Sequence, residues 1–397
     1  MPTLSFPLWP LLATMAMQTA ATMAAYSVPA LAPVIASDLG VDGALAGYFI
    51  SLVYGVGIAS SLLAARLIHR HGAVRVGQMI LVGALLMLLI SAYGGLAALA
   101  LGAIALGFGY GAAAPVSTHL LVPRTAPPIL NLVLSIRQIG VPLGGVLGAL
   151  LLPPIALAIG WQRAFLLQIV PLVLLMLLLQ LARRDWDRDA GATLAVGDGG
   201  LRALAVLLRG SGELRRLTFA SFVYSGTQLC FVAFTVVQLT SRAEFGLVAA
   251  GQALAVYQIS GVVSRPIWGW IADTWMPARR LLALQGLAMA LAALAAGQFA
   301  PGWPVPLVLL VCAIAGATAS GYTGIAYGEF VRLGGTQRTE ATGLGSAAMF
   351  TGVLLMPSFA TLLVTRFGSY ALAYGAVAVL ATTAGLLLAT GGHSSRA

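Results

Sequence analysis

Long apolar runs with almost no charged residues follow one another along this chain, and they constrain its fold more than any other feature. Hydrophobic residues make up 60% of the sequence and charged residues only 8%, whereas a soluble domain carries about 25% charged residues. A soluble globule of 397 residues could not cover its surface with so few charges, so the apolar excess must face lipid. The composition excludes a soluble enzyme and indicates an integral membrane protein.

The charged residues also exclude a nucleic-acid-binding protein. Every basic residue is an arginine, and 21 basic against 11 acidic residues give a net charge of +10. Nucleic-acid binding needs basic residues gathered on one face among polar and aromatic groups. In this chain the arginines stand singly or in pairs between apolar runs, which is the pattern of membrane-protein loops. We therefore expect no nucleic-acid partner.

Twelve of the apolar runs have about the length of a membrane crossing, which takes roughly 20 residues. Charges, prolines and glycines separate them into two groups of six. The first group is 9–36, 43–65, 74–93, 97–118, 129–158 and 164–182, and the second is 217–240, 247–271, 280–299, 305–330, 341–365 and 370–390. We expect an all-α integral membrane fold with twelve transmembrane helices in two pseudo-symmetric six-helix bundles.

A charged break between the two groups predicts the domain organisation. It spans 183–216, opens with Arg183-Arg184-Asp185, and holds seven arginines. We expect an N-terminal bundle over 1–182, a cytoplasmic linker over 183–216 with a short surface helix around 201–208, and a C-terminal bundle over 217–397.

The placement of arginines predicts the orientation in the membrane. If both termini lie inside, sixteen arginines fall in cytoplasmic segments and only Arg163, Arg242 and Arg366 fall outside. This asymmetry follows the rule that cytoplasmic loops carry the positive charge. We expect a multi-pass protein of the cell (inner) membrane with both termini cytoplasmic, surrounded by lipid and working as a monomer.

The two halves repeat each other locally. The fourth run contains Gly109-Tyr110 and the tenth contains Gly321-Tyr322, each shortly before a polar cytoplasmic turn. Internal repetition of this kind is typical of secondary transporters, in which duplicated bundles move around a central site.

The segment after the eighth run carries a family resemblance. Ser264-Arg265-Pro266-Ile267-Trp268-Gly269-Trp270-Ile271-Ala272-Asp273, followed by Arg279-Arg280, resembles the glycine–aspartate–basic signature of the major facilitator superfamily. The resemblance implies gating roles for Gly269, Asp273, Arg279 and Arg280, and for Arg70 and Gly72 in the first copy of the signature. In that first copy His69 occupies the aspartate position, which predicts either an altered gate or one that depends on pH.

Two arginines inside the apolar runs are the main candidates for substrate binding, because charge within hydrocarbon is costly and usually functional. They are Arg137 in the fifth run and Arg265 in the eighth. A guanidinium group binds a carboxylate through two parallel hydrogen bonds. The Arg-Pro-x-Trp-Gly run resembles that of oxalate/formate and monocarboxylate transporters, which implies that Arg265 holds a substrate carboxylate. The alternatives are a gating role for Arg265, paired with Asp273 or a backbone carbonyl, and snorkelling of Arg137 to the surface.

Further polar residues within the runs complete the candidate site. Pocket-lining candidates are Gln18, Tyr26, Tyr110, Gln228 and Tyr322, each with a purely structural role as the alternative. Candidates for carrying a coupling proton are Glu329 and His119. Pairing of Glu329 with Arg332 or Arg338, and a surface location for His119, are the competing interpretations.

Several familiar motifs are absent or misplaced. Gly107-Phe108-Gly109-Tyr110-Gly111-Ala112 fits a dinucleotide pattern but lies within an apolar run without a preceding strand. Cys230 and Cys312 show no disulfide or metal spacing. We expect no catalytic residues, no cofactor and no metal.

Three functions follow from the sequence, in order of preference. The first is secondary transport of a small organic anion by alternating access, with or without H+. The second is efflux of drugs or other lipophilic compounds. The third is a polytopic membrane receptor or enzyme, for which the sequence offers few of the acids and histidines that such a site needs.

Overall fold

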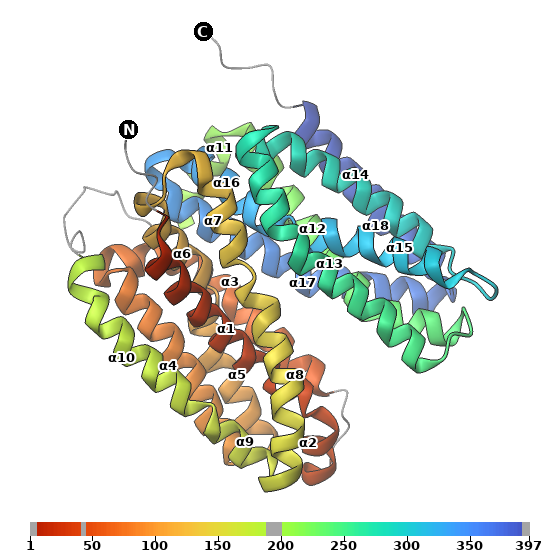
Figure 1. Cartoon of the computed structure of the whole chain (residues 1–397), viewed down its shortest axis with the longest axis horizontal. Helices are drawn as coiled ribbons and strands as arrows, with labels where there is room; N and C mark the ends of the chain where they lie inside the picture. The colour runs from red at the N-terminus through yellow and green to blue at the C-terminus, as the bar shows by residue number, and fades with distance from the viewer. Residues whose placement is uncertain (1–5, 41–44, 188–200, 391–397) are drawn as a thin grey trace. The chain divides into compact units, whose positions relative to one another are not determined.

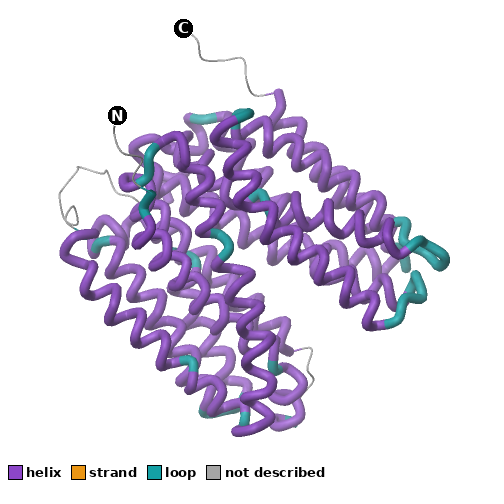
Figure 2. The backbone as a smooth tube through the Cα atoms, in the orientation of Figure 1, coloured by secondary structure: helices purple, strands orange, loops and turns teal. Residues whose placement is uncertain are grey.

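The computed structural model describes residues 6–40, 45–187 and 201–390, and within these ranges every regular element is helical (Figure 2). The expected all-α class is confirmed. Residues 188–200 of the predicted linker and Arg396 lie outside the described residues.

The helices account for twelve membrane crossings. Nine described segments are long and apolar enough to cross a bilayer, and a helix pair bent by 53°, α1 (Leu8–Ala30) and α2 (Ala32–Leu39), makes a tenth. One of the nine, 63 residues long, covers the predicted runs 305–330 and 341–365. The predicted run 247–271 lies in α13 (Leu247–Thr274), a helix of 28 residues that carries Arg265.

The chain forms two compact units (Figure 1). Unit 1 comprises Met1–Ala126, Arg137–Ala205 and Thr336–Ala347, and unit 2 comprises Pro127–Ile136, Val206–Gly335 and Ala348–Ala397. Besides α1 and α2, the helices within unit 1 are α3 (Leu45–His71), α4 (Ala73–Ala92), α5 (Leu96–Tyr110), α6 (Ala113–Leu121), η1 (Val122–Arg124), α8 (Gly140–Ile159), α9 (Trp161–Leu167) and α10 (Ile169–Trp186).

The second unit is likewise built of helices. Besides α13, its helices are α12 (Gly212–Ser241), α14 (Ala278–Gly297), α15 (Val305–Ala315), η3 (Gly316–Ser320), α16 (Thr323–Gly334) and α18 (Tyr370–Thr390), with the 3-10 turn η2 (Pro127–Ile129) at one end. A short helix, α11 (Leu201–Gly210), stands where the surface helix was expected. The role of 183–216 as a cytoplasmic linker stays a prediction.

Three α-helices divide between the units. Of α11, the residues up to Ala205 belong to unit 1 and the remainder to unit 2. Of α7 (Leu130–Arg137), the residues up to Ile136 belong to unit 2 and Arg137 belongs to unit 1. Of α17 (Arg338–Phe367), which follows the 3-10 turn η4 (Gly335–Gln337), the opening turns up to Ala347 belong to unit 1 and the remainder to unit 2. Each unit therefore holds the start of a helix that continues in the other.

Close helix contacts stabilise each unit. In unit 1, α1 packs on α8 and α4 packs on α5 and α10, and in unit 2, α18 packs on α14 and α12 (Figure 1). Small residues allow the helices to approach closely. A Cβ at Gly140 would lie only 2.7 Å from the Met15 carbonyl oxygen of α1, which is too close for a side chain. Packing through small residues is the usual way in which helices associate within a membrane.

Large apolar side chains are exposed over the outer surface. Leu157, Leu181 and Leu291 are among the most exposed, and many others on the same helices are more than one-third exposed. A soluble monomer rarely exposes so much apolar surface. These side chains are placed for contact with lipid, in agreement with the composition.

Candidate functional site

The tenth membrane crossing is broken in the middle, and the break is occupied by a π-helix. Helix α15 ends at Ala315, η3 is π-helical, and α16 begins at Thr323. A π-helical turn disturbs the regular hydrogen-bond ladder and often marks a functional site. Two side chains of α13 donate to the carbonyl of Ala317, from Ser264 Oγ at 3.0 Å and from Trp268 Nε1 at 2.6 Å.

Glycines allow α13 to approach this break closely. A Cβ at Gly261 would lie 2.6 Å from the Cβ of Ser320, and a Cβ at Gly316 would overlap the backbone of Tyr257. The run Gly316-Ala317-Thr318-Ala319-Ser320 is built of small residues, so its backbone can lie against α13. The small residues thus allow the close contact between this segment and α13.

Arg265 points into this contact. Its side chain is 2% exposed, and its Nε donates to the Ser320 carbonyl at 3.1 Å while Nη2 donates to Ser320 Oγ at 3.2 Å. Tyr257 and Tyr322 lie close enough to interact with it electrostatically. Of the gating partners proposed for Arg265, the structure provides a backbone carbonyl.

Two more predicted residues belong to the same cluster. Gln228 Nε2 lies 3.5 Å from Ser320 Oγ, and its backbone carbonyl accepts a bond from Tyr257 at 3.2 Å. Tyr322 is fully buried and donates weakly, at 3.4 Å, to the Ser221 carbonyl. Gln228, Arg265 and Tyr322 therefore lie together around the π-helix.

Arg137 has a comparable position in unit 1. Its side chain is 3% exposed, Nη1 donates to Gln138 Oε1 at 2.8 Å, and Nη2 donates to Gln18 Oε1 and to the Ala113 carbonyl, both at 2.9 Å. Ala113 is the first residue of α6, directly after the break that ends α5 at Tyr110. The guanidinium group therefore stays inside the unit and lies beside the broken fourth crossing.

A hydrogen-bonded chain links Arg137 to the other candidates of unit 1. Gln18 Nε2 donates to Thr22 Oγ1 at 3.0 Å, and Thr22 Oγ1 lies 3.1 Å from the Tyr110 hydroxyl. Tyr54 hydrogen-bonds both Tyr110 and Tyr26. The structure brings Gln18, Tyr26 and Tyr110 into one network with the arginine.

Sequence reasoning missed the residues that connect these networks. Thr22, Tyr54 and Ser320 are short or aromatic polar residues within apolar runs, and similar residues occur throughout the chain. Ser320 could have been found, because it directly precedes the Gly321-Tyr322 repeat. Thr22 and Tyr54 carry no such signal.

The gating candidate Asp273 caps another helix. Its Oδ1 accepts from the backbone amide of Asn131 at 3.1 Å and from Asn131 Nδ2 at 2.8 Å, and its Oδ2 accepts from the Leu132 amide at 2.8 Å. Both amides belong to the first turn of α7, where backbone N–H groups have no partner within the helix. A carboxylate there accepts hydrogen bonds from these groups and interacts favourably with the positive end of the helix dipole. A Cβ at Gly269 would lie 2.7 Å from the Asn131 carbonyl oxygen, so glycine is needed for this approach.

The basic gating candidates have different surroundings. Arg279 pairs with Glu213 over 3.1 Å. Arg332 lies 3.6 Å from Glu213 and 2.6 Å from Glu329, so it connects the two acids. Glu329, a predicted proton carrier, is therefore buried in an ion-paired cluster. Arg280 and Arg70 are exposed.

The first copy of the signature contains a second capping carboxylate. Gly72 has a φ of 88°, which an L side chain rarely adopts. The Val74 amide, in the first turn of α4, donates to Asp187 Oδ1 at 2.9 Å. A Cβ at Gly72 would overlap the Asp187 carboxylate, so the glycine is required both by the turn and by this cap.

The proton candidate His119 is partly buried and lies near the start of α17. Its Nδ1 lies 3.1 Å from Thr339 Oγ1.

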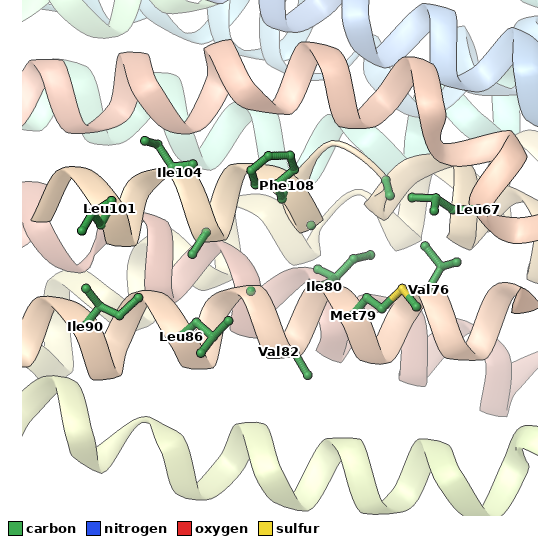
Figure 3. A pocket seen from close by; sticks show the side chains of 14 residues that line it. Leu67, Val76, Met79, Ile80, Val82, Leu86, Ile90, Leu101, Ile104 and Phe108 are labelled. Atoms are coloured by element: carbon green, nitrogen blue, oxygen red, sulfur yellow. The ribbon is translucent and has the colours of Figure 1, made fainter. Parts of the chain in front are cut away.

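An apolar groove of about 580 Å³ lies between α4 and α5 (Figure 3). Its wall includes Met79, Val82 and Phe108, all of which are exposed. Such a groove suits lipid chains rather than a polar substrate. Among the described residues no group of three His, Cys, Asp or Glu side chains is placed to hold a metal.

An all-helical membrane fold of two repeated six-helix bundles with broken crossings is typical of secondary transporters. The chain belongs to the Major Facilitator Superfamily, whose family model matches residues 11–331. The search of curated proteins found no match.

Solved structures agree with this assignment. The proton:xylose symporter XylE bound to 6-bromo-6-deoxy-D-glucose has a TM-score of 0.74 at 13% identity, with 97% of this chain and 95% of that chain covered. The E. coli fucose:proton symporter FucP has a TM-score of 0.74 at 14% identity, covering 97% and 98%. The human organic anion transporter MFSD10 (TETRAN) has a TM-score of 0.70 at 16% identity, covering 96% and 100%. At these identities the likeness concerns the fold.

Proposed function

We propose that this protein is a secondary transporter of a small organic anion that carries a carboxylate, and that it works by alternating access. The observation that carries the proposal is the Arg265 site: a guanidinium group that is 2% exposed and held beside a π-helix within the membrane. Arg265 is held in part by the hydroxyl of Ser320, a bond that a substrate carboxylate could replace with a stronger, charge-assisted one.

The broken crossings support a binding role for this region. In transporters, irregular backbone at membrane depth is tolerated where it lines a cavity, and substrate sites form at discontinuous helices. Arg265 donates to Ser320 at the end of η3, and Arg137 donates to Ala113 at the start of α6. We propose Arg265 as the carboxylate-binding residue, and Arg137 with Gln18, Tyr26 and Tyr110 as the polar lining contributed by unit 1.

The distribution of acids favours an anion over a cation. The sequence between Asp42 and Asp185 contains no acidic residue, so the apolar runs of the first half offer no carboxylate to a cationic substrate. The organic anion named for the structural neighbour MFSD10 belongs to the same chemical class as this proposal.

The proposed setting follows from the arginine asymmetry of the loops. We propose a multi-pass protein of the inner membrane with both termini cytoplasmic, working as a monomer surrounded by lipid. The proposed gate includes Gly269, Asp273, Arg279 and Arg280 of the second signature, with Arg70 and Gly72 of the first.

A thermal-shift panel tests the substrate class directly. We expect small mono- and dicarboxylates to raise the melting temperature of the purified protein, because a ligand at one hundred times its Kd adds about 2.7 kcal/mol to the native state. Sugars of similar size and lipophilic cations should have no effect. Stabilisation by lipophilic cations alone would contradict the proposal and favour drug efflux.

A further inference from the structure

Two rows of apolar side chains form the walls of the groove between α4 and α5. Every residue that lines the groove belongs to unit 1. The members of each row follow one another at intervals of three or four residues, so each row runs along one face of its helix. The rows are Met79, Val82 and Leu86 on α4, and Leu101, Ile104 and Phe108 on α5.

Small residues form the floor between these walls. A Cβ at Gly83 would lie 2.7 Å from the carbonyl oxygen of Ala105, and a Cβ at Gly109 would lie 2.7 Å from the Cα of Ile80. The two helices therefore approach closely, and the larger side chains stand on either side of the contact. A strip with a low floor and apolar walls fits an unbranched hydrocarbon chain.

The groove is long enough for an acyl chain of one leaflet. Figure 3 shows Leu67 and Val76 at one end of the groove, and Ile90 and Leu101 at the other. Along α4, Val76 and Ile90 are about 21 Å apart at 1.5 Å per residue. The hydrocarbon of one leaflet is about 15 Å deep, half of the roughly 30 Å of a bilayer. An acyl chain can therefore lie in the groove over the full depth of its leaflet.

Two exposed arginines stand at the end of the groove formed by Leu67 and Val76, which we call the arginine end. Arg75 precedes Met79 by four residues, so both lie on one face of α4. Arg70 follows Leu67 by three residues, so both lie on one face of α3. Guanidinium groups bind phosphate through pairs of parallel hydrogen bonds. The arginine end is therefore suited to a phosphate.

The carboxylates near the ends of α3 and α4 have other partners within unit 1. Asp187 caps the start of α4, and Glu340 lies 3.3 Å from His69 Nε2. Arg75 donates to the neutral side-chain amide of Gln78 over 3.4 Å. The arginine end therefore keeps positive charge for an anionic partner.

The opposite end of the groove carries no charge. The sequence contains no Asp, Glu, Lys or Arg between Arg75 and Arg124, so both helices are uncharged up to Ile90 and Leu101. The arginine asymmetry of the loops predicts that α4 begins on the cytoplasmic side. An amphiphile in the groove would therefore place its polar group at the cytoplasmic surface, where anionic phospholipids are present.

We propose that the groove is a binding site for one anionic phospholipid of the cytoplasmic leaflet, with an acyl chain between α4 and α5 and the phosphate on Arg70 and Arg75. The shape of the groove selects the chain, and the charge at one end selects a headgroup with net negative charge over a zwitterionic one. The site lies within unit 1 and is independent of the substrate proposed for transport.

Native mass spectrometry of the full-length, delipidated protein in detergent tests the proposal. The probes are phosphatidylglycerol and phosphatidylcholine with identical acyl chains. We expect saturable binding of one phosphatidylglycerol, roughly thirtyfold tighter than phosphatidylcholine, because each of the two arginines contributes about 1 kcal/mol toward an anionic headgroup. Millimolar inorganic phosphate should not displace the lipid, since it has no chain to fill the groove.

A variant of the arginine end tests the headgroup contact. Arg75→Gln should weaken phosphatidylglycerol binding about fivefold and leave phosphatidylcholine binding unchanged. Arg163→Gln removes an exposed arginine outside the groove and is the matched control, with wild-type affinity for both lipids.

A variant of the floor tests the chain contact. Ala105→Phe should fill the groove and abolish saturable binding of phosphatidylglycerol. Ala158→Phe, at an exposed alanine of α8, is its control and should bind as the wild type does. The melting temperature of each variant without added lipid shows whether it folds, and Arg75→Gln, at an exposed position, carries the test if Ala105→Phe does not.

Three outcomes would overturn the proposal. The first is equal affinity of the wild type for the two lipids, and the second is wild-type affinity for phosphatidylglycerol in Arg75→Gln. The third is displacement of the lipid by inorganic phosphate, which would show that the arginines bind free anions without help from the groove.

Discussion

The two buried arginines are held by different kinds of acceptor. Arg137 donates to two side-chain amides and a backbone carbonyl, and Arg265 donates to the carbonyl and the hydroxyl of Ser320. A hydroxyl can rotate away when a stronger acceptor arrives. At the residue scale, Arg265 is therefore suited to exchange partners with a substrate, and Arg137 is suited to organise the polar network around it.

Arg137→Lys tests the organising role. A lysine ammonium cannot reproduce the planar fork that reaches Gln138, Gln18 and Ala113. We expect a loss of at least one hydrogen bond to a charged group, worth about 1.5–3 kcal/mol, seen as a lower melting temperature of the purified protein.

The exposed Arg163→Lys is the control and should melt as the wild type does. Equal melting temperatures for Arg137→Lys and the wild type would show that the fork contributes nothing measurable and that Arg137 has no organising role.

The sequence identified the two arginines but not most of their partners. A charged residue within an apolar run is rare enough to stand out, so Arg137 and Arg265 could be found. Thr22 and Tyr54 could not, because such residues are common in membrane helices. The pair of His69 and Glu340 joins positions 271 residues apart, and a lone sequence contains no information on such a contact.

At the scale of helices, the breaks in the fourth and tenth crossings position the polar groups. The repeats Gly109-Tyr110 and Gly321-Tyr322 marked both regions in the sequence, but the π-helix at Gly316–Ser320 was not predicted. Its formation depends on donors from α13, such as Trp268 and Ser264. An irregularity that is stabilised by a neighbouring helix cannot be predicted from the sequence of the irregular helix alone.

The cap on α7 provides a test at this scale. In Asp273→Asn one oxygen remains as an acceptor, but the negative charge at the helix start is lost. We expect a loss of about 1 kcal/mol, measured as roughly fivefold faster hydrogen exchange at the amides of Asn131 and Leu132.

Glu244→Gln, an exposed acid on the α12–α13 connection, should leave the exchange of both amides unchanged. Unchanged exchange in Asp273→Asn would mean that the carboxylate does not protect the first turn of α7.

At the scale of the whole molecule, the number and order of the crossings followed from the apolar runs alone, because a helix must bury its backbone polar groups to cross lipid. The expected superfamily also followed, from the segment around Asp273, and the family model confirms it. The substrate did not follow, since many cargoes share this fold. The carboxylate class is our proposal, and it rests on the burial and hydrogen bonds of Arg265.

Uptake into proteoliposomes tests the central claim, that Arg265 binds a substrate carboxylate, most directly. The probe is a radiolabelled carboxylate from those that stabilise the purified protein. We expect saturable uptake by the wild type and by Arg163→Lys, and at least about tenfold weaker uptake by Arg265→Lys, because a lost charge-assisted hydrogen bond is worth about 1.5–3 kcal/mol. Uptake by Arg265→Lys at the wild-type rate and half-saturation would contradict the claim.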